Sequence, residues 1–215
     1  TGIQFSAKSV LRFGIVLLGA RITIEQLLSL GFTPIVIILT GVPLTILFSF
    51  ITGKFLKLSK SQSILSGSTV AICGASAALA VSAVLPNDKN SDKNLIFTVI
   101  GVTALSTIAM ITYPLIVSAL GLNEPESGIF LGATIHDVAQ VVGAGYIMSD
   151  NVGDVATFTK LLRVAMLVPV VILISVIVTA KYTNKGSGSS PAFPAFLIAF
   201  MVVVAINSTG SVPAI

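Results

Sequence analysis

The chain has 215 residues, of which 54% are hydrophobic and 9% are charged, and its mean hydropathy is +1.03. A soluble domain carries about 25% charged residues because its surface must be wetted, so this composition excludes a soluble globular enzyme and a disordered chain. The net charge of +4 arises without any run of Lys or Arg, which argues against a nucleic-acid-binding protein and leaves a polytopic membrane protein.

The spacing of charged residues predicts where the chain crosses the membrane. A membrane helix needs about 20 mostly apolar residues, and most of the uncharged runs in this chain reach that length. Strands in lipid leave backbone groups unpaired, and the alternation typical of a barrel does not appear. We therefore predict an all-α, polytopic helical membrane protein with about seven helical segments. The segments cover residues 5–20, 31–52, 64–85, 95–118, 127–147, 157–180 and 193–210.

Lysines in the polar connections predict the orientation of the chain. If every segment crosses completely, two groups of lysines fall on one side: Lys54, Lys57, Lys60, Lys181 and Lys185. The positive-inside rule places that side in the cytoplasm. Lys89 and Lys93 then lie on the opposite side and weaken the asymmetry. The segments together predict a single transmembrane domain over residues 1–215.

The third and fifth segments each contain a Gly-Ala-Ser or Gly-Ala-Thr sequence near mid-membrane depth. A glycine there allows the helix to break, and the N–H groups that begin the next half-helix can bind an anion, as in many secondary transporters. We predict interruptions near residues 73–76 and 132–137. The candidate substrate-binding residues at these interruptions are Gly74, Ala75, Ser76, Gly132 and Thr134. Close helix packing by small residues is the alternative explanation.

His136 and Asp137 are polar residues in the middle of an apolar segment. A charged side chain at this depth costs at least about 2.5–3.5 kcal/mol, so it usually faces a cavity or a partner. His136 is the only histidine and shares a helix face with Gln140, which makes both candidate site residues. A neutral, hydrogen-bonded core histidine is the alternative. Thr134 and Asp137 resemble a capping box for a half-helix that starts near residue 135, so Asp137 is either a helix cap or a functional charge.

Lys160 and Arg163 lie three residues apart, directly before the uncharged run 164–180. They are either an interfacial pair that reaches toward the headgroups or a cationic wall for an anion. The single Cys73 excludes an intrachain disulfide, and the sequence predicts neither a metal site nor a cofactor. Standard enzyme signatures are missing, and adjacent helical residues such as His136 and Asp137 point about 100° apart, which disfavours a catalytic triad with Ser76. We predict that the protein is not an enzyme.

Several stretches of the sequence resemble one family of membrane proteins. AICGASAA (71–78), GATIHDVAQVVGAG (132–145) and KLLRVAMLVPVV (160–171) look like signature stretches of the YeiH-like family, as do KSVLRFGIVLLGARIT (8–23) and Asn207-Ser208. These conserved bacterial membrane proteins are described as candidate sulfate exporters and are grouped loosely with cation/proton antiporters and anion transporters. Family members are longer at both ends. The resemblance therefore implies that this chain is a fragment, which lacks roughly two N-terminal spans and some C-terminal sequence.

The resemblance and the polar residues together predict a multi-pass secondary transporter in the bacterial inner membrane. Its substrate would be a small inorganic or sulfonate-like anion, and sulfate is the choice that the family implies. Half-helix N-termini near Ser76 and Thr134 would bind the anion, and Lys160 or Arg163 would supply positive charge. His136, tuned by Asp137, would couple a proton.

Two other functions stay open at this point. A cation/proton antiporter would bind its ion at Asp137 and His136, whereas a membrane sensor or assembly subunit would transport nothing. The coupling ion, either a proton or sodium, and self-association into a homo-oligomer are also left open. The lipid bilayer is the one partner that the composition itself predicts.

Overall fold

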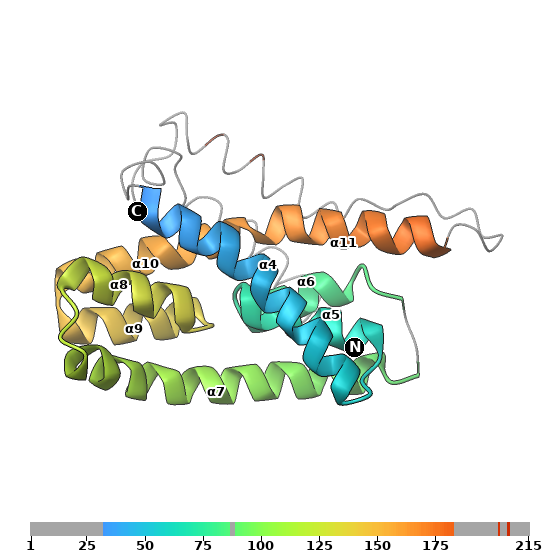
Figure 1. Ribbon diagram of the computed structural model, residues 1–215, viewed down its shortest axis with the longest axis horizontal. Coiled ribbons are helices and arrows are strands. Elements are labelled where there is room, and N and C mark those ends of the chain that lie inside the picture. Colours follow the sequence, from blue (N-terminus) through green and yellow to red (C-terminus); the bar gives the residue numbers. More distant parts are fainter. Residues whose placement is uncertain (1–31, 87–88, 183–201, 203–205, 207–215) are drawn as a thin grey trace.

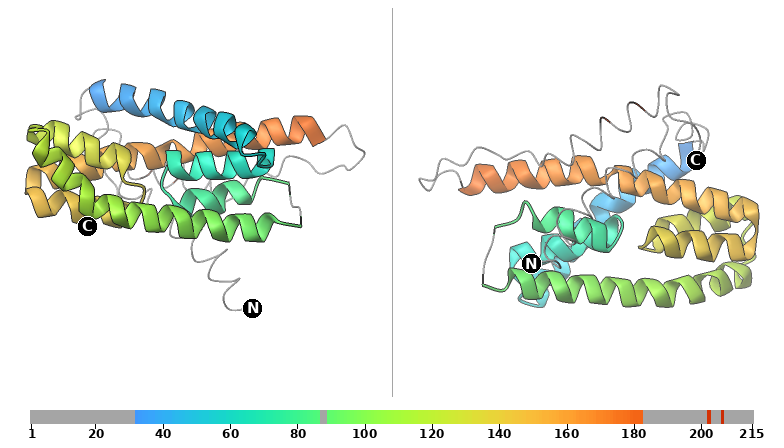
Figure 2. Two further views of the ribbon diagram at one scale, coloured as in Figure 1. Left: turned by 60° about the horizontal axis from the view of Figure 1, so that its bottom comes forward. Right: turned by 180° about the vertical axis from the view of Figure 1, so that it is seen from behind.

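The computed structural model describes residues 32–86, 89–182, 202 and 206, and every regular element within these residues is an α-helix (Figure 1). Three stretches are long and apolar enough to cross a membrane: α4 (Phe32–Phe55), α7 (Ser91–Ala119), and α10 (Asp150–Ala165) followed by α11 (Leu167–Tyr182). α7 and α10–α11 extend along the long axis of the molecule, and α4 crosses it obliquely (Figures 1 and 2), so the membrane normal follows this axis. The predicted all-α membrane fold is confirmed.

Four shorter helices lie between the long ones and form two hairpins. The first hairpin consists of α5 (Lys60–Ala71) and α6 (Ala75–Ser82), and the second consists of α8 (Glu124–Thr134) and α9 (Val138–Met148). Each hairpin turns back at its break and returns to the end of the molecule from which it started (Figure 1). A helix of 11 residues, such as α8, is about 16 Å long, which is half of the hydrocarbon thickness. The breaks therefore lie near the midplane.

In each hairpin the start of the first helix lies close to the end of the second, as a re-entrant hairpin requires. In the first hairpin, a small cavity at the start of α5 is lined both by Ser61 of α5 and by Ser82, at the end of α6. At the open end of the second hairpin, the Glu124 carboxylate accepts hydrogen bonds from Ser149 Oγ at 2.8 Å and Asn151 Nδ2 at 2.9 Å. These hydrogen bonds, the one from Asn151 more than the one from Ser149, hold the pKa of Glu124 below its usual range.

The predicted interruptions near 73–76 and 132–137 are confirmed, but the condition used to assign the lysines to sides, complete crossing by segments 64–85 and 127–147, is not met. Two half-helices contain as many apolar residues as one full crossing, so the length of an uncharged run does not distinguish them. Segments 31–52 and 95–118 correspond to α4 and α7. The helix predicted at 157–180 begins earlier, at Asp150. The search for uniformly apolar runs missed its first turns, because these turns are amphipathic. Segments 5–20 and 193–210 lie outside the described residues, except for 202 and 206.

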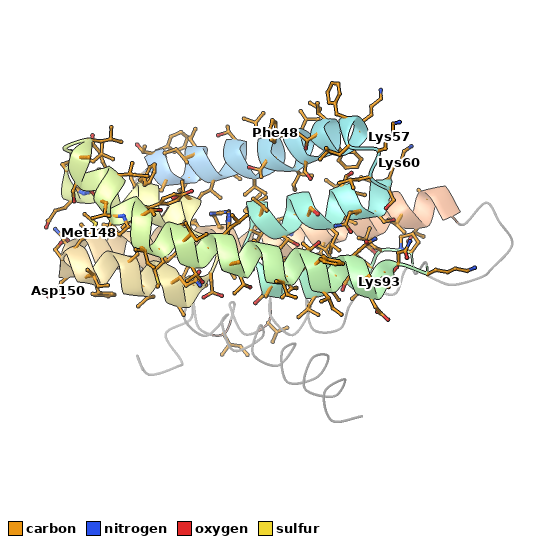
Figure 3. All side chains as sticks on the ribbon, turned by 90° about the horizontal axis from the view of Figure 1, so that it is seen from below. Phe48, Lys57, Lys60, Lys93, Met148 and Asp150 are labelled. Carbon is orange, nitrogen blue, oxygen red and sulfur yellow. The ribbon has the colours of Figure 1, made fainter. Side chains whose placement is uncertain are left out.

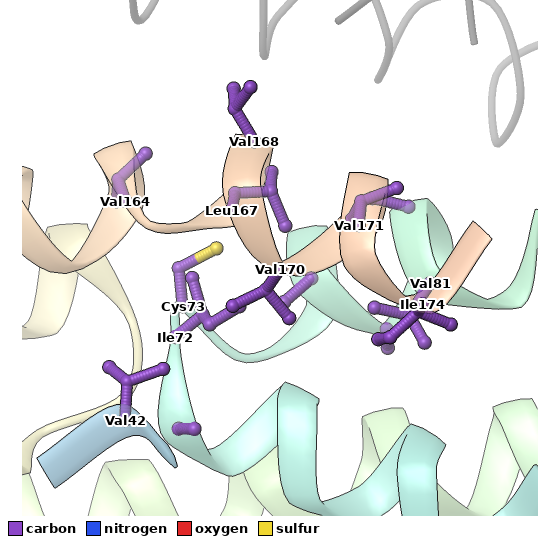
Figure 4. Close-up of a cluster of buried hydrophobic side chains, with 14 of the residues drawn as sticks. Val42, Ile72, Cys73, Val81, Val164, Leu167, Val168, Val170, Val171 and Ile174 are labelled. Atoms are coloured by element: carbon purple, nitrogen blue, oxygen red, sulfur yellow. The ribbon is translucent and has the colours of Figure 1, made fainter. Parts of the chain in front are cut away.

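A buried apolar cluster holds the tip of the first hairpin against α10 and α11 (Figure 4). Ile72 and Cys73 from the break pack with Val164, Leu167 and Val171, and all five side chains are buried. Within a membrane the lipid tails are as apolar as these side chains, so the cluster stabilises the contact by close van der Waals packing. The cluster therefore fixes this tip to the end of α10, where Lys160 and Arg163 lie.

The two ends of the molecule carry opposite net charge, although the lysine end also exposes Asp92. One end exposes lysines: Lys54, Lys57, Lys60, Lys89 and Lys93. The other end exposes carboxylates: Glu124, Glu126, Asp150 and Asp154. Figure 3 shows Lys57, Lys60 and Lys93 at one end and Asp150 at the other. The prediction that Lys89 and Lys93 lie opposite the other lysines is wrong, because the first hairpin returns the chain to its starting side.

We expect the lysine end to face the cytoplasm, since the positive-inside rule now has no opposing group among the described residues. In full-length protein with Cys73→Ala, a membrane-impermeant maleimide should label Asp150→Cys in intact cells. It should label Lys93→Cys only in inverted vesicles. The reverse labelling pattern would contradict this orientation, and labelling of both from one side would contradict the two-ended charge distribution.

Candidate functional site

The tips of the two hairpins meet in the middle of the molecule. A β-carbon placed on Gly74, in the first break, would lie 3.7 Å from the β-carbon of His136, in the second break. The hairpins approach from opposite ends, so their tips are the only parts of them that can meet there (Figure 2). We call residues 72–74 and 135–137 the tip junction.

Glycine is required at the first break by its backbone conformation. Gly74 has φ 71° and ψ −129°, a region that L-residues with a β-carbon rarely adopt. Its N–H donates to the carbonyl of Thr69 at 2.9 Å, which closes α5, and Gly74 itself is the N-cap of α6. Ala75 and Ser76 form the first turn of α6, so the N-terminus of this half-helix lies at the junction.

Asp137 caps the half-helix that begins at the second break. Its Oδ1 accepts a hydrogen bond from the N–H of Ala139 at 2.9 Å, which confirms the helix-cap interpretation. The predicted capping box with Thr134 is wrong. Thr134 is the last residue of α8, and its hydroxyl donates backward to the carbonyl of Phe130 at 2.6 Å. A cap still leaves the charge of Asp137 at the junction.

Ser106 of α7 stabilises the second break by accepting hydrogen bonds from its backbone. Its fully buried hydroxyl oxygen accepts the N–H groups of His136 at 3.1 Å and Asp137 at 3.2 Å. Both donors lost their helical partners when α8 ended. Ser106 was not among the predicted residues, and its sequence context gives no signal for it. Thr107 and Thr112 are hydroxyl residues of the same helix, yet their hydroxyls donate to carbonyls within α7.

Lys160 joins the two tips. Its side chain is completely buried, and its Nζ donates to the carbonyls of Ile72 and Ile135, each at 2.9 Å. One of these carbonyls belongs to each break. Because α10 packs against both α8 and α9, it carries this amine into the junction.

Arg163 covers the C-terminal ends of both half-helices that enter the junction. Its Nε and Nη2 donate to the carbonyls of Val70 and Ala71 at 2.7–3.0 Å, and Nη1 donates to those of Ala133 and Ile135. These carbonyls have no partner within their own helices and carry the negative end of the helix dipole. The interfacial interpretation of Lys160 and Arg163 is wrong, because both lie at the hairpin tips on the buried face of α10.

The remaining predicted residues divide into packing and junction positions. A β-carbon on Gly132 would collide with the carbonyl oxygen of Ala156, so Gly132 serves the contact between α8 and α10. Gln140 is in the first turn of α9, where its Nε2 donates to Thr107 Oγ1 at 2.9 Å and its buried Oε1 has no partner in the described structure. The Nδ1 of His136 is likewise buried without a described partner. The charges of Arg163 and Lys160 both act on the His136 ring.

With Lys160 protonated, the junction has an excess of positive charge. Lys160 and Arg163 contribute two cations, and neither forms an ion pair within the described part of the chain. Asp137, which is half-buried, is the carboxylate of the junction. The described residues contain no group of His, Cys, Asp and Glu side chains that could hold a metal ion. The site is therefore suited to an anion by its charge.

Comparison with known proteins identifies the family. A family model described as "Conserved hypothetical protein 698" matches residues 1–215. The chain belongs to this family. A UPF0324 membrane protein of Chlorobaculum tepidum is 53% identical over 215 residues, which cover 99% of this chain and 60% of that protein. The UPF0324 membrane protein TauZ of Paracoccus denitrificans is 46% identical, with coverage of 99% and 64%.

These relatives confirm the predicted membership of a conserved membrane-protein family and the location of the chain in the membrane. A UPF0324 membrane protein of Rhizobium meliloti, 45% identical, is matched over 61% of its length. The chain thus spans 60–64% of the length of these three relatives. No solved structure matches the chain.

Proposed function

We propose that the protein is a secondary transporter of a small inorganic or sulfonate-like anion, and that the anion binds at the tip junction. The observation that carries this proposal is the convergence of Lys160 and Arg163 on both tips, where Asp137 balances only one of them. Buried charge is costly unless it is compensated. A bound anion supplies the missing negative charge.

The ends of the half-helices that lie at the junction favour anion binding. α5 and α8 end at the junction, and Arg163 already satisfies their last carbonyls. α6 and α9 begin there, and a helix N-terminus carries about half a positive charge together with N–H groups that have no helical partner. Asp137 occupies one donor of α9. The first turn of α6, with Ala75 and Ser76, is therefore the preferred hydrogen-bonding partner, whereas the two cations act through their charge.

Because the two hairpins enter from opposite ends, the anion could reach the junction from either side of the membrane. Movement of the first hairpin away from the junction would open it toward the lysine end, and movement of the second would open it toward the carboxylate end. Alternating access needs one site that opens to either side in turn. The relatives are longer than this chain, so the proposed transport is an activity of the whole protein.

Sulfate counterflow in vesicles tests the proposed function. Full-length protein reconstituted into liposomes loaded with unlabelled sulfate should accumulate labelled sulfate, and protein-free liposomes should not. An aliphatic sulfonate serves as a second probe anion. Absence of exchange with both anions would contradict the proposal. Sodium-dependent proton movement without anion exchange would favour the cation/proton antiporter, and the absence of any flux would favour the sensor or assembly subunit.

Substitutions at Asp137 separate its cap from its charge. The amide oxygen of Asp137→Asn can still accept the N–H of Ala139, so we expect an unchanged melting temperature. Asp137→Ala should lose about 1 kcal/mol of stability, since it removes the cap. If the charge contributes to transport, both variants should change the rate of sulfate counterflow. Normal counterflow in Asp137→Asn would show that Asp137 is only a helix cap.

A further inference from the structure

We propose that Lys160 carries the coupling proton of this transporter: its amine gains a proton when the anion enters the tip junction and loses the proton after the anion leaves. This inference rests on the proposed anion transport and reassigns the proton from His136. It would make the protein a proton–anion symporter.

The hydrogen bonds of Lys160 are compatible with both protonation states. Within the described structure its Nζ has two acceptors, the carbonyls of Ile72 and Ile135. An ammonium group has three N–H bonds, whereas a neutral amine has two N–H bonds and a lone pair. Both carbonyl contacts therefore persist when the third proton leaves. Lys160 can change its charge without releasing either tip.

The charges around Lys160 link its proton to the anion. The titratable groups around it are the guanidinium of Arg163 on its own helix, the uncharged thiol of Cys73 in the first break and the carboxylate of Asp137 in the second. His136, also in the second break, is in turn affected by Lys160. In the empty junction a neutral Lys160 leaves Arg163 to balance Asp137. Once an anion is bound, a charged Lys160 offsets one negative charge of that anion, because a low-dielectric interior disfavours unpaired charge of either sign.

The proton follows a simple route. A hydronium ion on the side to which the junction is open donates a proton to the lone pair of Nζ, so that one O–H bond breaks, one N–H bond forms and water is left. After the site opens to the other side and the anion leaves, that N–H bond breaks and the proton passes to water there.

Arg163 and His136 fit the role of proton carrier less well than Lys160 does. An Arg guanidinium does not deprotonate in proteins, and the N–H groups of Arg163 are already directed at backbone carbonyls. A protonated His136 would add a third positive charge beside Lys160 and Arg163. Lys160 is the cation of the junction whose charge can be removed while its contacts remain.

Two vesicle assays with full-length protein separate the coupling from the transport. Counterflow without a pH gradient measures labelled sulfate exchange alone. Uptake driven by an inward proton gradient of one pH unit, at zero membrane potential, measures coupling and should reach about tenfold accumulation for one proton per anion. Lys160→Arg keeps a permanent charge, so its steady-state accumulation should fall to about onefold, whatever rate of exchange it retains. The exposed Lys93→Arg is the matched control and should behave as the unsubstituted protein.

The outcomes distinguish the two proposals. Full gradient-driven accumulation in Lys160→Arg would overturn the role of Lys160 alone, whereas absence of counterflow in the unsubstituted protein would overturn the anion transport on which it rests. If Lys160→Arg does not fold, proton uptake is measured with a pH dye when sulfate is added to weakly buffered His136→Gln protein. Retained uptake of about one proton per bound sulfate supports Lys160 as the carrier. Loss of that uptake overturns it in favour of His136.

Discussion

Arg163→Met should lower the free energy of unfolding by about 3–5 kcal/mol, because it leaves buried carbonyls at the ends of α5 and α8 without a donor. The carbonyls of Val70, Ala71 and Ala133 lose the donors that Arg163 supplies, whereas the carbonyl of Ile135 keeps its hydrogen bond from Lys160. Each buried polar group that loses its partner costs about 1–3 kcal/mol, and methionine replaces only the volume of the side chain. Relaxation of the two helix ends should recover part of the loss.

The melting temperature of the detergent-solubilised protein measures this effect. A loss of this size corresponds to roughly 10 °C in a domain of this length. Lys93→Met is the matched control, since it removes an exposed cation near the start of α7, and its melting temperature should change little. An Arg163→Met protein as stable as the control would show that Arg163 does not hold the two half-helices.

Gly74→Leu should leave a folded protein whose sulfate counterflow is slower by about tenfold or more. A leucine at φ 71° adopts a strained backbone conformation, which costs about 1–3 kcal/mol. Its β-carbon would already touch His136 and the Cγ1 of Val102, at 3.7 and 3.8 Å, so the larger branches would separate the tips. The substitution therefore acts on the junction directly.

Gly101→Leu is the control for this prediction. Gly101 is exposed on α7, and a β-carbon there meets nothing within 4 Å. The same glycine-to-leucine change should leave counterflow unaltered at this position. Unchanged counterflow in a folded Gly74→Leu protein would instead support the packing explanation of the Gly-Ala-Ser sequence.

The sequence predicted the first break from Gly74 and the second from Gly132 and the capping pattern of Asp137, although Gly132 itself lies within α8. A glycine in an apolar segment permits an unusual φ, and an acidic residue favours the start of a half-helix. The direction of the chain after each break could not be predicted. It depends on contacts between distant residues, such as Glu124 with Ser149 and Asn151.

The roles of Lys160 and Arg163 were predictable only in part. Their charge in a membrane segment marked them as functional candidates, but their partners are backbone carbonyls 25–93 residues away. Carbonyls leave no trace in a sequence, since every residue has one. Ser106 was missed for the same reason, because its two partners are backbone N–H groups of the second break.

A disulfide between the two tips is the most direct test of the tip junction. The β-carbons at positions 74 and 136 are 3.7 Å apart, within the range of about 3.5–4.5 Å that a disulfide requires. Full-length protein with Cys73→Ala, Gly74→Cys and His136→Cys should form this bond on mild oxidation, as detected by mass spectrometry of non-reduced peptides. The control pair Gly101→Cys and His136→Cys should not form it. Two free thiols in the oxidised Gly74–His136 pair, with both cysteines confirmed by alkylation after denaturation, would contradict the meeting of the tips.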